Sequence, residues 1–390
     1  MGGVAFNDVA SPTFWVFALV AVLCLALAER GDRFKWTLAA LNLGFLALMV
    51  GVGPAGLLLL SATVLHGAGR PGPSWQRWAF VTAAGTLVMS AFLVHKLPVL
   101  PQAWGPAKSV FVAVGMSYVV LRAVEYLRAG IEGHTAQVSL IDTVNYLFPF
   151  HMLAAGPVMA FSDFQRQPVP APALDREAAL QAFERIAAGL FKKFVLADGL
   201  IQTMFLTDFK AEGAYWILEV QMYYLYIYLD FSAYSDIAVG LGRLLGVATP
   251  ENFNRPLAAR NIVVFWERWH MSLSQFIRRN LFIPLQLMGM RWTQGKRPRL
   301  VASLAFAVSF MLCGLWHGIS WRFLIWGAGH ALALIACHLY RDALIRRLGR
   351  KGAAAFSERP AVRALATVLT FEFVALSLEF LAHPATAFLG

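Results

Sequence analysis

The fold is decided by the stretch Leu300-Val-Ala-Ser-Leu-Ala-Phe-Ala-Val-Ser-Phe-Met-Leu-Cys-Gly-Leu-Trp316, which carries no charged side chain. A helix that crosses the hydrocarbon core of a bilayer needs about 17–25 such residues. His317 follows directly, and a second apolar run covers 320–340. Because basic loops bound the far ends of both runs, we expect a membrane hairpin that turns at 316–320, away from the cytoplasm.

Apolar runs recur along the whole chain of 390 residues, of which 58% are hydrophobic and only 14% charged. This composition excludes a soluble globular protein. The candidate crossings lie at 13–28, 36–51, 53–68, 77–95, 107–126, 139–161, 182–205, 213–231, 300–316, 320–340 and 361–384. We therefore predict an all-α polytopic membrane protein with roughly ten to twelve transmembrane or re-entrant helices.

Three basic loops, at 30–35, 255–299 and 341–351, set the predicted orientation. Positive charge in short loops marks the cytoplasmic side of a membrane protein. The first apolar run follows Asp8 and precedes the basic residues, the reverse of the charge order in a cleavable signal peptide. We expect an uncleaved first helix with its N-terminus outside. Attraction to anionic membrane lipids, and not nucleic acid, explains the net charge of +11.

The apolar segment 223–240 contains a group of carboxylate and hydroxyl side chains, namely Asp230, Ser232, Tyr234, Ser235 and Asp236. Buried carboxylates need hydrogen-bonding or cationic partners, or else they become protonated. Arg243 and Arg255 are the candidate partners. The group either forms a structural polar knot that fixes a helix break, which is the favoured interpretation, or takes part directly in chemistry.

The next segment, Glu251-Asn-Phe-Asn-Arg-Pro256, has the asparagines and the proline typical of a turn. Asn252, Asn254 and Arg255 either hold a phosphate or a carbonyl group near the cytoplasmic face or cap the following helix. The sequence leaves both alternatives open.

Trp266, Trp269 and His270 have the spacing of residues that share one face of a helix. An amphipathic helix in the membrane interface, with tryptophan at headgroup depth, explains Trp266 and Arg268. It does not explain His270.

The apolar run 281–285 is too short to cross the membrane and ends this region. We therefore predict horizontal or re-entrant helices over 255–299. Irregular backbone at membrane depth survives only where protein or a water-filled cavity covers it. A cavity is expected there.

His270 and His317 are the two candidate catalytic residues. A histidine in an apolar segment costs free energy, so each is a functional hypothesis by default. A lone histidine in a helical hairpin is otherwise a satisfied structural residue. Gly314 and Gly318, which flank His317, leave room for another backbone or a substrate to approach the ring.

Several motifs occur in a fixed order over about 110–330: Gly115-Met-Ser-Tyr118, Phe148-Pro-Phe-His-Met-Leu-Ala-Ala-Gly-Pro157 with Asp163-Phe164, Gly189-Leu-Phe-Lys-Lys-Phe194 with Ala197-Asp198, Tyr228-Leu-Asp-Phe-Ser-Ala-Tyr-Ser-Asp236, Pro250-Glu-Asn-Phe-Asn-Arg-Pro256, Phe265-Trp-Glu-Arg-Trp-His-Met-Ser-Leu-Ser274 and Gly314-Leu-Trp-His-Gly318. Together they resemble the membrane-bound O-acyltransferase family, in its bacterial branch of alginate O-acetylation and teichoic-acid D-alanyl transfer membrane proteins.

That resemblance implies helices around a central tunnel, in the bacterial cytoplasmic (inner) membrane. It implies transfer of an acyl group, by default acetyl, from a cytoplasmic thioester to a hydroxyl of an extracytoplasmic polysaccharide or cell-envelope acceptor. The donor is acetyl-CoA, or else an acyl-carrier-protein thioester, and no cofactor is permanently bound. His317 matches the catalytic histidine, which acts as a general base, and His270 matches the second family position. A separate extracytoplasmic esterase-like partner is also implied.

Further residues on the matching motifs are assigned to donor binding or to the tunnel: Trp316, Trp269, Asp230, Ser232, Tyr234, Asp236, Asn252, Asn254, Arg255, Arg268 and Ser274. We predict one integral membrane domain over 1–390. It comprises variable N-terminal helices at 1–106, the family core at 107–340 and a C-terminal helix at 341–390.

Two departures from the family pattern concern His151 and the C-terminus. His151 occupies a position where glutamine or another polar residue is expected. The chain stops soon after 377–380, where alginate-type relatives continue through further helices. The identity of the acceptor and of the partner therefore stays open.

Two other classes of protein compete with an acyltransferase. A transporter or channel would use the intramembrane aspartates and histidines as an ion or proton path, but the sequence lacks inverted repeats. An intramembrane metalloenzyme would need a close ligand pair such as His-Glu-x-x-His, whereas His330 and His338 are eight residues apart. No metal is therefore expected, and cysteine spacing predicts neither a disulfide framework nor a thiolate metal site.

Overall fold

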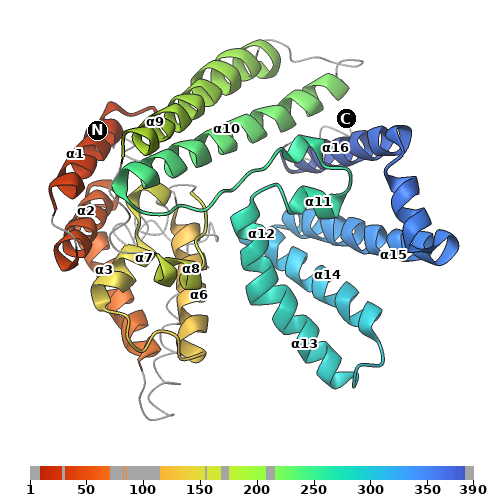
Figure 1. The fold of residues 1–390 in the computed structure, drawn as a ribbon, viewed down its shortest axis with the longest axis horizontal. Helices are drawn as coiled ribbons and strands as arrows, with labels where there is room; N and C mark the ends of the chain where they lie inside the picture. The colour runs from red at the N-terminus through yellow and green to blue at the C-terminus, as the bar shows by residue number, and fades with distance from the viewer. Residues whose placement is uncertain are drawn as a thin grey trace. The chain divides into compact units, whose positions relative to one another are not determined.

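A computed structural model of the chain describes residues 9–28, 31–70, 82, 85, 115–153, 156–167, 175–207 and 216–382. Over these residues the secondary structure is helical and contains no strand, which confirms the predicted fold class (Figure 1). The chain divides into two compact units, one of Met1–Leu190 with Tyr234–Pro250 and one of Phe191–Ala233 with Glu251–Gly390. The predicted crossing at 77–95 and most of the one at 107–126 lie outside the described residues.

The first unit is built from helices of very different lengths. They are α1 (Pro12–Leu27), α2 (Asp32–Val50), α3 (Val52–Gly69), α6 (Met116–Ile131), α7 (Leu140–Leu147), η2 (Phe150–Met152), α8 (Phe161–Arg166) and α9 (Arg176–Leu190). The predicted crossing at 139–161 is wrong, because the helix stops before Pro149. A residue before proline avoids the helical conformation. The buried Asn42 side chain then accepts a hydrogen bond from the backbone N–H of Phe150, at 2.9 Å, and satisfies the broken backbone.

The second unit carries the longest helices of the described chain. Its elements are the π-helix η3 (Phe191–Thr207), η4 (Pro256–Ala258), α11 (Ile262–Trp266), α12 (Met271–Ile277), the π-helical η5 (Arg278–Phe282), α13 (Ile283–Trp292), α14 (Pro298–His317), α15 (Trp321–Ser357) and α16 (Pro360–Ala382). Helix α10 (Trp216–Leu245) contributes residues to both units.

Five described helices are long and apolar enough to cross a membrane, namely α2, α3, α14, α15 and α16. They correspond to the crossings predicted at 36–51, 53–68, 300–316, 320–340 and 361–384. Large apolar side chains such as Leu57, Leu304 and Leu332 are exposed on them. A lipid-facing surface has this character, because hydrocarbon does not penalise apolar exposure.

The hairpin of α14 and α15 turns where the sequence predicts, since α14 ends at His317 and α15 begins at Trp321. Two glycines bring the helices together. A Cβ atom on Gly314 would overlap the carbonyl oxygen of Phe323, and one on Gly327 would overlap that of Phe310. Small residues permit this close backbone approach between membrane helices. The position of His317 is therefore set by tight helix packing.

The stretch 255–299 begins with the short elements η4 and α11, and its horizontal or re-entrant arrangement in the membrane stays a prediction. Helices α12, η5 and α13 nevertheless form one continuous helical run from Met271 to Trp292, so the run 281–285 does not end the region. Pro284 lies in the first turn of α13, next to the π-helical turn. A π-turn shifts the hydrogen-bond pattern and accommodates the N–H that proline lacks.

Candidate active site

His317 is the last residue of α14, and its side chain is exposed. Three aromatic rings surround it. The centroid of the Trp316 ring lies 4.7 Å from that of the imidazole, the Trp326 ring meets it edge-on at 5.4 Å, and the Phe323 ring lies parallel to it at 6.4 Å. The space that Gly314 and Gly318 leave is occupied by the backbone and the ring of Phe323. The imidazole is thus oriented by its neighbours while it stays accessible.

His270 is buried and fixed by hydrogen bonding. Its Nδ1 lies 3.1 Å from Asn252 Oδ1, and the Phe231 ring meets the imidazole edge-on at 4.8 Å. Asn252 Oδ1 also accepts hydrogen bonds from the backbone N–H and the hydroxyl of Ser272. Because a backbone N–H can only donate, this atom is the amide oxygen, and Nδ1 of His270 must carry a proton. Asn252 therefore selects the tautomer of His270.

Electrostatics couple the two histidines. Burial, and secondarily the positive charge that His317 can carry, lower the pKa of His270 to about 3. His270 lies outside the candidate membrane-spanning helices. At neutral pH it is consequently an uncharged hydrogen-bonding group, whose protonation is disfavoured by its surroundings.

The expected helix face that joins Trp266, Trp269 and His270 is wrong. Helix α11 ends at Trp266, and His270 adopts the left-handed conformation, with φ at 44°. The helix is interrupted between them, because this conformation does not continue a right-handed helix. Both tryptophans are buried, at 7% and 8% exposure, so neither lies at headgroup depth on an exposed helix.

The two tryptophans enter different aromatic clusters. Trp269 packs among Tyr224, Tyr228, Phe253 and Phe265. Trp266 packs against Phe310, Trp326 and His330. Trp269 thus anchors the segment before His270, while Trp266 belongs to the cluster that also contacts His317 through Trp326.

His330 on α15 joins three helices through a directed chain of hydrogen bonds. Trp266 Nε1 donates to its Nδ1 at 3.3 Å, and its Nε2 lies 3.2 Å from Ser377 Oγ on α16. The Ser377 hydroxyl donates to the carbonyl oxygen of Val374. From the sequence, His330 was considered only as a metal ligand. Its four-residue spacing from Trp326 on one helix face was the signal for its place in this cluster.

The carboxylates of α10 are paired, but not with the expected arginines. Lys193 Nζ lies 2.6 Å from Asp230 and 3.1 Å from Asp198 in the second unit. Arg185 Nε lies 2.6 Å from Asp236 in the first unit. The π-helical pattern of η3 explains the pair of Lys193 and Asp198, because it brings residues five apart onto the same side. Arg243 and Arg255 are therefore not the partners of these carboxylates.

The polar group of α10 does not mark a helix break, because α10 is continuous from Trp216 to Leu245. Ser232 is buried, and its hydroxyl donates to the carbonyl oxygen of Leu229 at 3.3 Å, which a continuous helix permits. Tyr234 packs, half-buried, against the core of the first unit. The ion pairs with neighbouring helical segments take the place of the expected polar knot.

A cavity of about 480 Å³ in the second unit carries an unusual concentration of arginine. Its lining residues are Asn254, Arg255, Ala258, Arg260, Val264, Arg268, Glu358, Arg363 and Thr367. We call it the arginine pocket. The backbone N–H of Asn254 donates to the carbonyl oxygen of Arg268 at 2.9 Å and closes the turn beside it. Asn252 does not line this pocket, so the two asparagines of the turn have separate roles.

Three charged members of the arginine pocket were not predicted from the sequence. Arg260 follows the expected turn directly, whereas Glu358 and Arg363 come from the end of α15 and the start of α16. Nothing local in the sequence signals that these distant segments meet.

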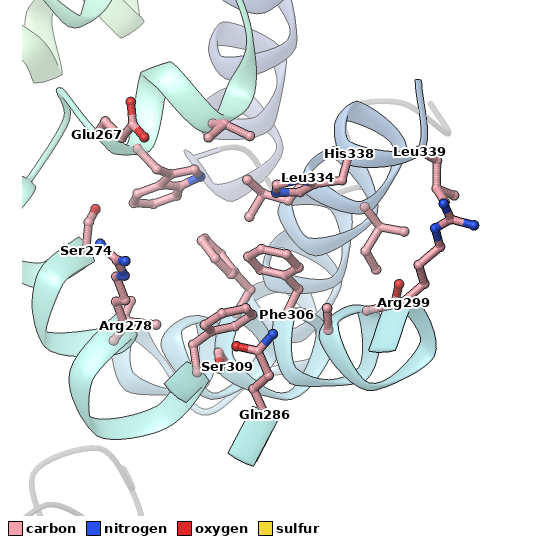
Figure 2. A pocket seen from close by; sticks show the side chains of 18 of the residues that line it. Glu267, Ser274, Arg278, Gln286, Arg299, Phe306, Ser309, Leu334, His338 and Leu339 are labelled. Atoms are coloured by element: carbon pink, nitrogen blue, oxygen red, sulfur yellow. The ribbon is translucent and has the colours of Figure 1, made fainter. Parts of the chain in front are cut away.

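A second cavity, of about 600 Å³, is lined by residues of α11, α12, η5, α13, α14 and α15. Figure 2 shows Glu267, Ser274 and Arg278 on one side of it and Phe306 among the apolar side chains of its interior. The Ser274 hydroxyl also donates to the carbonyl oxygen of Trp269 at 3.3 Å. This cavity confirms the prediction of a hollow within 255–299.

Comparisons with known proteins agree on one family. Residues 86–357 match the model of the membrane-bound O-acyltransferase family. The chain is 28% identical to a teichoic acid D-alanyltransferase of Streptococcus thermophilus, over 77% of this chain and 75% of that protein. It is 35% identical to a probable alginate O-acetylase of Azotobacter vinelandii, over 57% of this chain and 43% of that protein. It is 33% identical to a peptidoglycan O-acetyltransferase of Helicobacter pylori, over 52% of this chain and 38% of that protein.

Proposed function

The chain belongs to the membrane-bound O-acyltransferase family, and from that premise we propose that it carries an acyl group, by default acetyl, from a cytoplasmic thioester to an extracytoplasmic hydroxyl. The acceptor is a polysaccharide or another cell-envelope polymer. The observation that supports this proposal is the accessible imidazole of His317, oriented by aromatic rings and electrostatically coupled to His270. The transporter alternative is set aside because the matched relatives are acyltransferases.

His317 acts as the general base in this mechanism. Its imidazole takes the proton of the acceptor hydroxyl while the oxygen attacks the thioester carbonyl carbon. The tetrahedral intermediate then expels the thiolate, the C–S bond breaks, and the imidazolium returns the proton to sulfur. An imidazole with an unperturbed pKa near 6.5 suits both steps at neutral pH. Such assistance typically contributes about 10²–10⁴-fold to the rate.

His270 organises the donor side of the site and does not exchange the proton. Its burial, its fixed tautomer and its lowered pKa support this role, because an imidazole that resists protonation is a poor base. Trp269 and Ser274 hold the segment around it, and Trp316 orients the ring of His317. Arg255 and Arg268 lie on the side where the thioester arrives.

The orientation in the membrane, the donor carrier and the partner protein complete the proposal. The basic loops support a cytoplasmic donor side, and the bacterial relatives support a location in the cytoplasmic membrane. The relatives' names include both D-alanyl and acetyl transfer, so a D-alanyl or acyl carrier protein is the second candidate donor. A separate extracytoplasmic esterase-like protein completes transfer onto the polymer.

The decisive experiment incubates purified protein in nanodiscs with radiolabelled acetyl-CoA and measures label transfer or thioester hydrolysis. The wild type is expected to turn over the donor, and His317→Ala to lose that turnover. His134→Ala is the matched control, since His134 is also exposed and lines neither cavity described above. Equal turnover in wild type and His317→Ala would overturn the role of His317.

A further inference from the structure

The arginine pocket has a net positive charge, which favours the binding of an anion. Four guanidinium groups, those of Arg255, Arg260, Arg268 and Arg363, line it against the single carboxylate of Glu358, so four positive charges less one negative leave a formal charge of +3. Guanidinium groups in such numbers bind phosphate well, because each offers a planar fork of donors.

One carboxylate of the protein already neutralises part of the positive charge in the pocket. Glu358 forms ion pairs with Arg260 and, at 3.7 Å, with Arg363. Within the described part of the chain, Arg255 and Arg268 have no carboxylate partner. Arg255 is moreover held in the left-handed conformation, with φ at 49°, which is uncommon for a residue other than glycine. Two arginines are thus committed to Glu358, and two stand ready for a ligand.

The pocket is connected through the backbone to the proposed active site. Arg268 contributes its side chain to the pocket, while its carbonyl oxygen closes the turn with Asn254. His270 follows Arg268 by two residues, and its Nδ1 is fixed by Asn252, which precedes Asn254 by two residues in the facing segment. A ligand that binds the arginines therefore lies beside the segment that places His270.

We propose that the arginine pocket binds the phosphate groups of the acyl donor's carrier, as found in coenzyme A or in a phosphopantetheine arm. This inference rests on the proposed function. The flexible pantetheine arm between phosphate and thioester separates the charged end of the donor from the reacting carbonyl. Binding of phosphate displaces Glu358 from Arg260 and Arg363, because phosphate offers more acceptor oxygens than one carboxylate.

The test compares acetyl-CoA with S-acetylpantetheine, which carries the same thioester without phosphate. For Arg268→Gln and Arg255→Gln, the ratio of the KM for acetyl-CoA to the KM for S-acetylpantetheine is expected to rise about tenfold, the effect of one charge-assisted contact. For Glu358→Gln the ratio should instead fall about threefold, since the internal competitor is gone. Arg347→Gln, an exposed arginine of α15 outside the pocket, is the matched control. If these residues had only a structural role, their substitution would not change the KM ratio in opposite directions for the arginine and glutamate variants.

Failure of this inference and failure of the proposed function give different results. If the wild type transfers acyl groups but the KM ratio is the same in all variants, the pocket does not bind the donor phosphate. If the wild type uses neither thioester, the proposed function fails. Calorimetry with adenosine 3′,5′-bisphosphate then measures phosphate binding to wild type and Arg268→Gln without any need for turnover. Loss of that binding in the variant supports a phosphate site, and equal binding overturns it.

A lipid phosphate is the other source of the same chemistry. Nanodiscs with and without phosphatidylglycerol separate the two sources. An unchanged KM ratio, together with weaker capture of phosphatidylglycerol by Arg268→Gln, would assign the pocket to the lipid and overturn the donor assignment.

Discussion

His317 and His270 are both imidazoles of the second unit, yet their surroundings are opposite. His317 is exposed at the end of a long helix and lies among aromatic rings. His270 is buried in a turn, in a left-handed conformation, and its tautomer is fixed by Asn252. The difference separates an accessible imidazole, which the proposed mechanism uses as the base, from a buried imidazole whose lowered pKa disfavours protonation. Variants that remove one of these properties at a time test whether the two histidines differ in role.

The largest effect is expected from removing the free imidazole. His317→Ala should lower kcat by about 10²–10⁴-fold, because the general base is lost. Its Tm should stay within a degree or two of wild type, since an exposed side chain contributes little to packing. Steady-state kinetics and thermal unfolding in detergent measure both. A variant that unfolds much earlier than wild type would mean that His317 is structural, and the contrast with His270 would disappear.

The next effect tests the helix contact that positions His317. Gly314→Ala should destabilise the hairpin by roughly 3 kcal/mol and reduce kcat, because the new Cβ overlaps the backbone of Phe323. Gly329→Ala on the same hairpin is the control, since a Cβ there meets nothing within 4 Å. Thermal unfolding and turnover of the two variants give the comparison. Equal behaviour of the two variants would contradict the tight contact between α14 and α15.

A smaller effect is expected where His270 is held. Asn252→Ala removes the acceptor shared by His270 and Ser272 and should cost about 2 kcal/mol of stability, because buried donors lose their partner. Asn254→Ala should leave the Tm nearly unchanged, since that side chain is exposed. If Asn252→Ala instead loses kcat with unchanged Tm and donor KM, His270 takes part in proton transfer.

The smallest effect is the pH dependence of stability. The unfolded imidazole takes up a proton near pH 6.5, whereas the pKa of folded His270 is about 3. Between these values the unfolded state binds more protons, so acid favours unfolding by about 1.4 kcal/mol per pH unit for each such histidine. His151, with its pKa also lowered to about 3 by burial, adds the same slope.

The variant His270→Asn isolates the contribution of His270 to that slope. Its amide can donate to Asn252 in place of Nδ1, but it does not titrate. Measured between pH 7 and pH 5, the Tm of the variant should fall less steeply than that of wild type. Parallel curves would show that His270 is not held neutral.

Much of the hairpin around His317 could be predicted from the sequence, because local features specify it. Apolar runs of membrane length, basic loops at their far ends and the two glycines define where α14 ends. The site around His270 could not be predicted in the same way. Helical spacing of Trp266, Trp269 and His270 suggested one face, but the left-handed conformation of His270 depends on Asn252, which lies 18 positions away.

Long-range pairing explains the other errors. Lys193 reaches Asp230 across 37 positions, and Arg185 reaches Asp236 across 51, so neither partner is visible from the spacing within α10. The π-helical turns of η3 add a periodicity that differs from the helical pattern used to interpret sequences. The arginine pocket depends on the same kind of meeting, because Glu358 and Arg363 come from distant helices.

The hydrogen-bond chain through His330 has a consequence for where protons can travel. The Trp326 ring lies 5.4 Å from His317 and 4.5 Å from His330, so the two imidazoles have a common neighbour. The lone pair of His330 Nδ1 is occupied by the N–H of Trp266, and its Nε2 proton faces Ser377, whose own proton points to Val374. The one ring nitrogen of His330 that can accept a proton is therefore already engaged as an acceptor. If His317 is the general base, as proposed, the engaged acceptor nitrogen of His330 disfavours loss of its proton into the helix bundle by that route.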